Sequence, residues 1–483
     1  MLFNSVNFFL FLFSSLIVYR LIPYKFRWIL LLISSICFYC IGGLQYLAVP
    51  VMITIFTYYV GIFLDKTNSN KTKNLILHLG VIVNVGLLIF FKYINFLISN
   101  LAQFFNFLNI NTNSLNVSQT DSFIKFGVPL GISFIAFQAI GYIVDIHSGK
   151  IKCEKNIGFF ATFIFFFPKV ISGPIERPQD FLPQLLEKHE FNYQQTIEGF
   201  KRIVWGLFKK LVIANRLAIY TDAVFNNYEY HSAITLLFAA VLYSFQLYAD
   251  FSGYVDIAIG VSSLFGIKLT ENFNRPLFAL SITEFWRKWH ITLTKWVTDY
   301  IFNPIVLKRR YWGKWGVVYS TMVTFIILGA WHGANWTFVV FGLLHGLIIS
   351  IEFLSKKVRK KVRKKISSKI NNVLSICYTI LFFSFTMIFF KSNNMDEAFG
   401  IIEKIILMAD YKLYLGGKSG FIYSLFGLLF LFFYELNIEF KFFKIKIFES
   451  KNIFVEQFSY AFLIINILLI GVYDGGQFIY FQF

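Results

Sequence analysis

A histidine, His332, lies inside a strongly apolar run in the stretch LGAWHGANWTFVVFGLLHG, residues 328–346. A neutral imidazole takes up a proton near neutral pH, so this residue type is suited to act as a base. Ionisable side chains are rare within membrane spans, and each one marks a candidate functional site. A histidine packed or hydrogen-bonded between two helices explains the same stretch, so taken alone it leaves a packed, a pore-lining and a reactive histidine all open.

The residues around His332 predict a closely packed pair of helices. If the helix continues past His332, Asn335 lies on the same face three residues on. His345 follows in the next apolar stretch, and we interpret it mainly as a packing residue. Four small residues, spaced in two pairs, allow two helix backbones to approach closely: Gly329, Gly333, Gly342 and Gly346.

A second histidine, His290, lies in the stretch SITEFWRKWHITLTKWVTDY, residues 281–300. Its aromatic and apolar residues step by three and four, which predicts one helix with an apolar stripe at headgroup level: Trp286, Trp289, Leu293, Trp296 and Tyr300. His290 falls at the margin of this stripe. It is therefore either an interfacial histidine with its tip in water or a residue of a functional site.

Two carboxylates, Asp250 and Asp256, interrupt the apolar stretch LYADFSGYVDIAIG. A carboxylate near membrane depth is costly unless it is paired or wet. Arg275, Arg287 or the histidines are possible partners, and the sequence does not choose among them. The chain has no Walker loop, HExxH pair, GxSxG elbow or GxGxxG turn at a strand–helix junction, so we predict no metal site and no nucleotide hydrolysis.

The elements that position these residues are membrane helices. Of 483 residues, 57% are hydrophobic and 15% charged, and the mean hydropathy is +0.62. A soluble domain has about 25% charged residues, so an ordinary soluble globule is excluded. Many apolar runs reach the ~17–25 residues that span a bilayer. We therefore predict an all-α, polytopic membrane protein with a single integrated domain over residues 1–483.

The positive charge of +19 belongs to the loops, where Lys and Arg mark cytoplasmic segments. Residues 1–19 carry no charge and the first basic residues follow them, so we expect the N-terminus outside. The loop 99–122 carries no charge except one Asp and is also expected outside, as is the C-terminus. The run SKKVRKKVRKKISSK at 355–369 is the strongest cytoplasmic cluster. It predicts contact with anionic membrane lipids, and we expect no nucleic-acid partner.

The middle of the chain is less regular. We predict two spans near 233–249 and 252–267, one on each side of Asp250. Four of the nine prolines lie in FFPKVISGPIERPQDFLPQ, which no straight helix can cross. That segment is either a broken element buried in the protein or a surface loop after a span that ends near Phe167.

Five stretches in order along the chain resemble the membrane-bound O-acyltransferase family, in its bacterial branch for O-acetylation of alginate and other polysaccharides. They are MLFNSVNFFLFLF, FFPKVISGPIERPQDFLPQL, the block from DFSGYVDIAIG to DYIFNPI, WHGANWTFVVFGLLHG and the terminal FIYFQF. The resemblance implies a ring of about 11–13 transmembrane helices around a central tunnel, with re-entrant and interfacial helices and a family core over about residues 120–350.

The resemblance also implies a site and a reaction. The family's two marked histidines match His290 and His332, and His332 is the expected catalytic base. Further residues are expected to line the tunnel or bind substrate: Asn335, Trp331, Trp289, Asp250 and Asp256. The donor is expected to be acetyl-CoA or another acyl thioester, used as a substrate, with no permanently bound cofactor. Asn335, an indole N–H or His290 could stabilise the oxyanion, and direct transfer and an acyl-histidine intermediate both stay open.

The implied setting is the bacterial inner membrane, with a cell-envelope polysaccharide or peptidoglycan as the final acceptor. The chain has no large external domain to bind a polymer, so an extracytoplasmic acetyltransferase is the expected partner. D-alanyl transfer to teichoic acid is the alternative within the family. A transporter without catalysis is the alternative from a different class.

Overall fold

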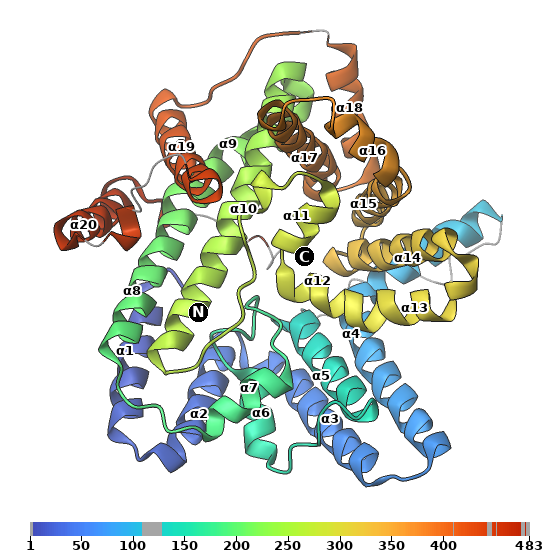
Figure 1. Cartoon of the computed structure of the whole chain (residues 1–483), viewed down its shortest axis with the longest axis vertical. Helices are drawn as coiled ribbons and strands as arrows, with labels where there is room; N and C mark the ends of the chain where they lie inside the picture. The colour runs from blue at the N-terminus through green and yellow to red at the C-terminus, as the bar shows by residue number, and fades with distance from the viewer. Residues whose placement is uncertain are drawn as a thin grey trace. The chain divides into compact units, whose positions relative to one another are not determined.

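The computed structural model describes residues 3–108, 128–408, 410–441, 447–450, 452–474 and 479. These residues form helices and connecting turns, with no β-strand among them, as Figure 1 shows. The predicted all-α class is confirmed. The predicted external loop at 99–122 lies partly outside the described residues, as does all of the terminal FIYFQF except Ile479.

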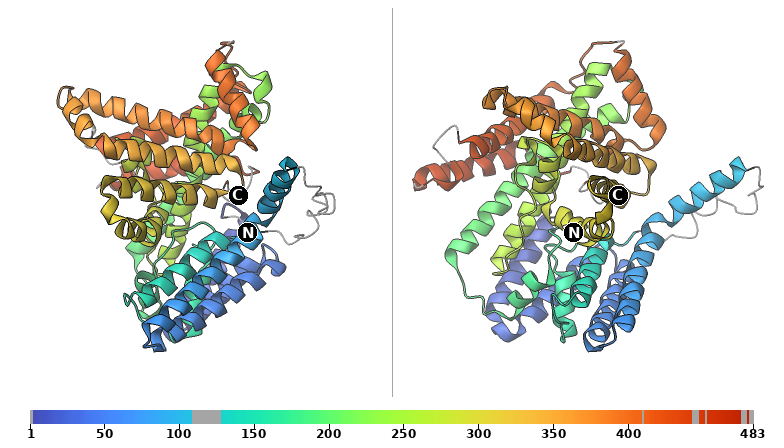
Figure 2. Two further views of the ribbon diagram at one scale, coloured as in Figure 1. Left: turned by 90° about the vertical axis from the view of Figure 1, so that its right-hand side faces the viewer. Right: turned by 45° about the vertical axis from the view of Figure 1, so that its right-hand side comes forward.

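The chain divides into two compact units, and the prediction of one integrated domain is not tested by this division. The first unit comprises residues 1–192 with 262–269. Its helices are α1 (Val6–Leu21), α2 (Arg27–Cys40), α3 (Ala48–Lys66), α4 (Asn70–Phe107), α5 (Ile132–His147), α6 (Ile157–Phe165) and α7 (Pro178–Leu186). Within it α3, α4 and α5 pack against one another, as the blue and teal helices of Figure 2 show. In the same unit α2 packs against α6.

The proline-rich segment belongs to this first unit and is buried. After α6 ends at Phe165, the chain turns through Phe166, Phe167 and Val170, all of which are inaccessible to solvent. Lys169 is also fully buried and donates a hydrogen bond to the carbonyl oxygen of Phe163 at 2.5 Å and another to the Gln138 side chain. The segment is therefore a broken element packed inside protein, and the surface-loop alternative is wrong.

The second unit comprises residues 193–261 and 270–483. Its first helices are α8 (Tyr193–Leu207), a π-helical segment (Phe208–Ala214), α9 (Asn215–Phe225) and α10 (Ala233–Leu264), whose last three residues are counted with the first unit. Short helices follow: α11 (Ile282–Lys288), α12 (Ile291–Val297) and α13 (Asn303–Lys308). The remaining helices are α14 (Lys314–His332), α15 (Trp336–Leu354), α16 (Lys356–Arg363), α17 (Ser368–Lys391), α18 (Met395–Leu407), α19 (Lys418–Phe440) and α20 (Ile453–Ile470).

Eight helices of the described part are long and apolar enough to cross a membrane. This is fewer than the 11–13 implied by the family resemblance. Part of the difference lies in α1 and α5, which are apolar but have only 16 residues each, below the ~17–25 residues of a bilayer crossing. These eight helices confirm the prediction of a multi-pass membrane protein.

The helix α10 corrects one prediction. The two spans expected near 233–249 and 252–267 are a single helix of 32 residues, Ala233–Leu264. The gap between the two predicted spans falls at Asp250 and Phe251, which both lie inside this helix. Asp250 and Asp256 do not end the helix because each is paired with a basic side chain from the preceding segment.

Candidate functional site

The segment that carries His290 is not one helix, contrary to prediction. α11 ends at Lys288 and α12 begins at Ile291, with His290 between them in the left-handed conformation at φ 42° and ψ 55°. A non-glycine residue in this region is held by its surroundings. Hydrogen bonds from the preceding loop do so: Ile291 N donates to the Asn272 carbonyl oxygen at 2.9 Å, and Asn274 N donates to the Lys288 carbonyl oxygen at 2.9 Å.

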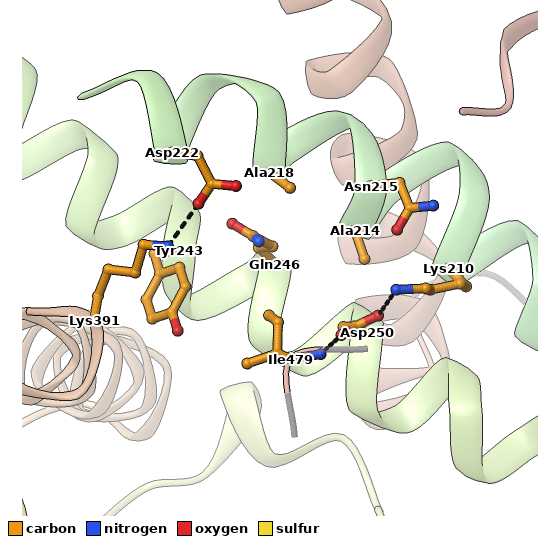
Figure 3. A pocket seen from close by; sticks show the side chains of 10 residues that line it. All are labelled: Lys210, Ala214, Asn215, Ala218, Asp222, Tyr243, Gln246, Asp250, Lys391 and Ile479. Atoms are coloured by element: carbon orange, nitrogen blue, oxygen red, sulfur yellow. Dashed lines mark hydrogen bonds and ion pairs between the residues drawn. The ribbon is translucent and has the colours of Figure 1, made fainter. Parts of the chain in front are cut away.

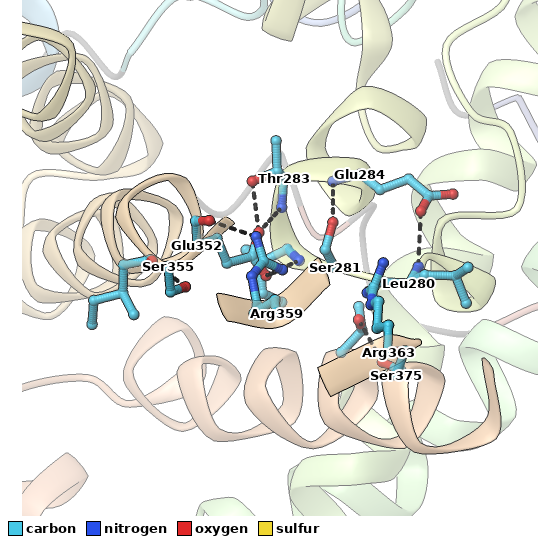
Figure 4. A network of polar contacts seen from close by, with 12 residues as sticks. Leu280, Ser281, Thr283, Glu284, Glu352, Ser355, Arg359, Arg363 and Ser375 are labelled. Atoms are coloured by element: carbon cyan, nitrogen blue, oxygen red, sulfur yellow. Dashed lines mark hydrogen bonds and ion pairs between the residues drawn. The ribbon is translucent and has the colours of Figure 1, made fainter. Parts of the chain in front are cut away.

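The N-terminus of α11 is held by a carboxylate from α15. Glu352 accepts hydrogen bonds from Ile282 N at 2.9 Å, Thr283 N at 3.0 Å and the Thr283 hydroxyl at 2.6 Å (Figure 4). An anion at a helix N-terminus satisfies backbone donors and meets the positive end of the helix dipole. Glu352 is only 3% exposed, so this contact is an internal anchor for the helix that precedes His290.

His290 is completely buried, which excludes the interfacial histidine with its tip in water. Its ring is perpendicular to that of Phe251, with centroids 4.8 Å apart, and lies 6.3 Å from the ring of Trp331. Its Nδ1 lies 3.2 Å from Oδ1 of Asn272. The site around His290 is thus an aromatic enclosure in which the Asn272 side chain lies at Nδ1 of the imidazole.

His332 is the last residue of α14 and is 3% exposed. Its ring centroid lies 5.0 Å from that of Trp331, 5.6 Å from that of Phe341 and 5.2 Å from that of Phe390. Since Trp331 also contacts the ring of His290, one indole joins the two histidines. The structure therefore brings together three sequence-predicted site residues in the second unit.

The close helix pair predicted around His332 is confirmed. A Cβ atom added at Gly329 would lie 2.8 Å from the Cα of Gly342 and 2.3 Å from the carbonyl oxygen of Phe338. One added at Gly342 would lie 2.2 Å from the carbonyl oxygen of Phe325. Only glycine fits at either position, so these residues set the approach of α14 and α15.

Asn335 does not extend the helix that carries His332. α14 ends at His332, and Asn335 is instead the N-cap of α15: its Oδ1 accepts a hydrogen bond from Thr337 N at 3.2 Å. Its Nδ2 donates to the carbonyl oxygen of Asn393 at 2.5 Å. The continued helix is wrong because Gly333 adopts an extended conformation that turns the chain into the next helix.

Asp250 pairs with Lys210 rather than with any predicted partner. The Nζ of Lys210 lies 2.6 Å from Oδ1 of Asp250, and the backbone N–H of Ile479 donates to Oδ2 at 2.9 Å (Figure 3). The pair lines a small cavity of about 30 Å³ together with Asn215, Gln246 and the ion pair of Lys391 with Asp222. Asp250 therefore lies in a polar cavity among α9, α10 and the π-helical segment.

Asp256 pairs with Lys209 and Arg202, not with Arg275, Arg287 or a histidine. Arg202 donates to its carboxylate at 3.0 Å, and Lys209 also bonds to it. These partners lie in an amphipathic, basic stretch of the sequence, residues 199–217, but the sequence does not show which of its residues face Asp250 and Asp256. A π-helical segment at Phe208–Ala214 changes the helical period, and both Lys209 and Lys210 reach carboxylates of α10.

A cavity of about 180 Å³ lies next to the aromatic enclosure of His290. Basic and acidic side chains line it, with aromatic walls that include Tyr248 and Phe273. The ring of Phe273 lies 5.2 Å from that of Trp289 and 6.5 Å from that of His290. Trp289, another predicted site residue, therefore packs behind the wall between this cavity and His290.

The cations of this cavity are matched by carboxylates. Arg202 contacts both Asp256 and Glu271, while Arg275 contacts Glu439 at 2.7 Å. Burial lowers the pKa of the Arg202 guanidinium, but the neighbouring carboxylates of Asp256 and Glu271 outweigh it and make the net shift upward. Arg202 is therefore permanently charged, and the cavity is close to neutral overall.

His345 is a fully buried histidine with both ring nitrogens engaged. The indole N–H of Trp286 donates to its Nδ1 at 3.1 Å, so Nε2 carries the proton and donates to the Thr386 hydroxyl at 3.1 Å. It thereby joins α11 to α15 and α17.

Sequence reasoning missed Asn272 and Glu352 as site residues, because an Asn in a loop and a Glu at a helix end carry no periodic signal.

Comparison with known proteins identifies relatives of this chain. Residues 155–391 match the family model described as MBOAT, membrane-bound O-acyltransferase family. The chain is 33% identical to a peptidoglycan O-acetyltransferase of Helicobacter pylori, covering 78% of this chain and 73% of the relative. It is 33% identical to a probable alginate O-acetylase AlgI of Azotobacter vinelandii, covering 86% and 79%. It is also 29% identical to a teichoic acid D-alanyltransferase of Bacillus subtilis, covering 55% and 69%.

Proposed function

Because the chain belongs to the membrane-bound O-acyltransferase family, we propose that this O-acyltransferase moves an acetyl group from a cytoplasmic thioester to a hydroxyl of the cell envelope. The final acceptor is a polysaccharide or peptidoglycan, as the names of its relatives indicate for those proteins. One observation carries the proposal: two buried histidines contact one indole within a single compact unit.

The reaction needs one base. The acceptor oxygen attacks the thioester carbonyl carbon while its proton moves to a neutral imidazole, and a C–O bond forms. The tetrahedral intermediate then collapses, the C–S bond breaks, and the thiolate leaves with the proton returned from the imidazolium. We assign the base to His332, and the oxyanion must receive a hydrogen bond from a nearby donor.

The position of His332 supports this assignment. It ends α14, where the carbonyl groups of the helix favour a transient positive charge on the imidazole. The surrounding aromatic rings keep bulk water away from the thioester, which limits its hydrolysis. Asn335 is less suited to bind the oxyanion, since its amide already caps α15 and bonds to Asn393.

The cavity next to Phe273 is our candidate for the donor side. Its charged side chains are paired with one another, so it suits an uncharged, amide-bearing arm better than a group of phosphates. Its wall separates it from His290 by a single aromatic ring. A thioester donor of the acetyl-CoA or carrier-protein type offers such an arm, whose thioester end would reach the histidines past Phe273.

The proposed setting is the bacterial inner membrane, with both termini outside. The helix α16 carries six basic residues in its eight positions, which supports a cytoplasmic position against anionic lipids. We propose that an extracytoplasmic acetyltransferase receives the acetyl group and delivers it to the polymer. Expectations of no metal, no permanently bound cofactor and no nucleic-acid partner remain part of this proposal.

D-alanyl transfer to teichoic acid is the second candidate. It is favoured by the 29% identity to the Bacillus subtilis D-alanyltransferase, although that match covers only 55% of this chain. The two reactions share the thioester donor and the histidine base, so the site does not distinguish them. The ester that each reaction produces, O-acetyl or D-alanyl, does distinguish them.

Ester analysis of wall and capsule fractions from a deletion strain tests the proposal. We expect O-acetyl esters to be lost from one polymer fraction and restored by the wild-type gene, while D-alanyl esters are unchanged. Loss of D-alanyl esters would favour the second candidate. Unchanged amounts of both esters would contradict both candidate functions.

A further inference from the structure

We propose that Asn272 is a positioning residue that holds His290 in the Nδ1–H tautomer, so that Nε2 is the nitrogen able to accept a proton. The inference rests on the proposed function, because it gives His290 a defined part in acyl transfer. Asn272 lies in the loop between α10 and α11, and its side chain is fully buried beside the histidine.

The orientation of the Asn272 amide follows from its contacts. The backbone N–H of Thr292 donates to one of its two terminal atoms at 3.0 Å, and the Thr292 hydroxyl lies 2.9 Å from the same atom. A backbone N–H can only donate, so the atom that it contacts is the carbonyl oxygen Oδ1 and not Nδ2.

This orientation determines where the proton of His290 lies. The imidazole Nδ1 is 3.2 Å from the same Oδ1, and a carbonyl oxygen offers only lone pairs. Nδ1 must therefore carry the hydrogen. A charged imidazolium is disfavoured in a fully buried aromatic enclosure, so the ring is neutral and has one N–H. The lone pair then belongs to Nε2.

The backbone of Asn272 reinforces this arrangement. Its carbonyl oxygen accepts the hydrogen bond from Ile291 N at 2.9 Å, so one residue binds the chain on the C-terminal side of His290 through both its main chain and its side chain. His290 itself is in the left-handed conformation, which leaves its ring direction dependent on such contacts. Asn272 therefore fixes the backbone turn and the tautomer together.

The state of Nδ2 of Asn272 indicates that this residue has a role beyond stabilising the fold. This buried amide nitrogen makes no hydrogen bond within the part of the chain that the structure describes. A residue selected only for stability would be expected to satisfy its donor as well as its acceptor. The arrangement serves Oδ1 and the residues that bond to it.

The tautomer has a chemical consequence. A neutral His290 with its lone pair on Nε2 can accept a proton or a hydrogen bond at that atom, but it cannot donate one to an oxyanion. Of the oxyanion donors considered for this reaction, His290 is thereby removed. It is instead a second acceptor, next to the donor-side cavity and joined to His332 through Trp331.

The test compares Asn272→Asp with Asn272→Leu in full-length protein in proteoliposomes. Aspartate keeps an acceptor oxygen at the position of Oδ1, whereas leucine has a similar volume and none. Solid-state NMR of ¹⁵N-histidine-labelled protein reports the tautomer, and the signal lost in His290→Gln identifies His290. We expect Nδ1–H in the wild type and in Asn272→Asp, and loss of that signature in Asn272→Leu.

Acyl transfer provides the second readout. Removing the partner that sets the tautomer of a catalytic imidazole costs a serine protease about 10⁴-fold in kcat. We expect Asn272→Leu to lose roughly 10²-fold or more in kcat with little change in donor KM, and Asn272→Asp to recover most of it. Asn84→Leu is the control, since Asn84 is equally buried and, among the described residues, bonds only to Thr57 and Gly80 of the first unit.

An Nε2–H signature for His290 in the wild type would overturn the proposal. So would loss of activity in Asn272→Leu with the Nδ1–H signature intact, because Asn272 would then act in another way. The tautomer is measured without turnover. Wild-type protein that shows Nδ1–H but transfers no acetyl group would therefore contradict the proposed function and leave the positioning by Asn272 in place.

Discussion

Glu352 on α15 and Thr283 at the start of α11 are joined by two hydrogen bonds, from the Thr283 backbone N–H at 3.0 Å and from its hydroxyl at 2.6 Å. The helix α11, which precedes His290, is thereby anchored to α15, which follows His332. Arg359 lies 3.9 Å from the same carboxylate, so the anchor also reaches the basic cluster at 355–369.

Replacing Glu352 by glutamine tests this anchor. The amide can accept at only one terminal atom and carries no charge, so at least one of three donors on Ile282 and Thr283 loses its acceptor. A buried donor left without a partner costs about 1–3 kcal/mol. We expect a lower thermal unfolding midpoint and weaker acyl transfer. Glu190→Gln, at an exposed ion pair with Lys188, is the control and should change neither.

Replacing His345 by glutamine separates a packing histidine from the reactive ones. His345 joins Trp286 to Thr386, and glutamine can both accept and donate in its place. We expect His345→Gln to retain acyl transfer within about tenfold, because a neutral hydrogen bond contributes only about 1 kcal/mol. His345→Phe should lower stability. A loss in His345→Gln as large as that in His332→Gln would assign His345 to the chemistry.

Alanine at Gly342 should separate α14 from α15. The added Cβ would lie 2.2 Å from the Phe325 carbonyl oxygen, which is backbone and cannot move aside alone. The helix that ends at His332 must then shift, and displacements of about 1 Å near a reacting centre cost on the order of 10²-fold in rate. Acyl transfer by purified Gly342→Ala measures this loss.

Gly420→Ala on α19 is the matched control. Apart from its own helical turn, no described part of the chain lies within 4 Å of its added Cβ, and alanine has the higher helix propensity. We expect unchanged activity and equal or higher stability. Equal activity of both alanine variants would contradict the role of the glycine contact in placing His332.

The buried pair of Lys210 and Asp250 should behave as a unit. Asp250→Asn leaves the ammonium of Lys210 without its anion, and breaking a buried pair costs about 3–5 kcal/mol. The double variant Asp250→Asn with Lys210→Met removes the uncompensated charge, so we expect its thermal midpoint to recover. Additive destabilisation by the two changes would show that the ion pair carries no coupling.

The fold class could be predicted from the sequence because it depends on local quantities. Apolar run length and loop charge identify membrane helices without knowledge of their neighbours. The close approach of α14 and α15 was predictable for the same reason, since the pairs Gly329 with Gly333 and Gly342 with Gly346 are visible in the sequence.

The predictions that were wrong concern elements whose shape depends on polar contacts between distant parts of the chain. The periodic stripe around Trp286 and Trp289 predicted one helix, but bonds from residues 272–274 hold His290 in a left-handed turn. α10 continues through Asp250 because Lys210 is brought to it by a π-helical segment. Neither Lys210 nor Asn272 could be paired with its partner from sequence spacing alone.

The role of His332 as the base is tested by measuring acetyl transfer by His332→Ala in proteoliposomes supplied with labelled acetyl thioester. We expect kcat to fall roughly 10²–10⁴-fold while the protein stays folded, because the base that takes the acceptor proton is gone. His78→Ala is the control: this histidine on α4 bonds to Asn74 of its own helix, lies outside the second unit and should be dispensable for transfer. Wild-type transfer by His332→Ala would show that His332 is not the base.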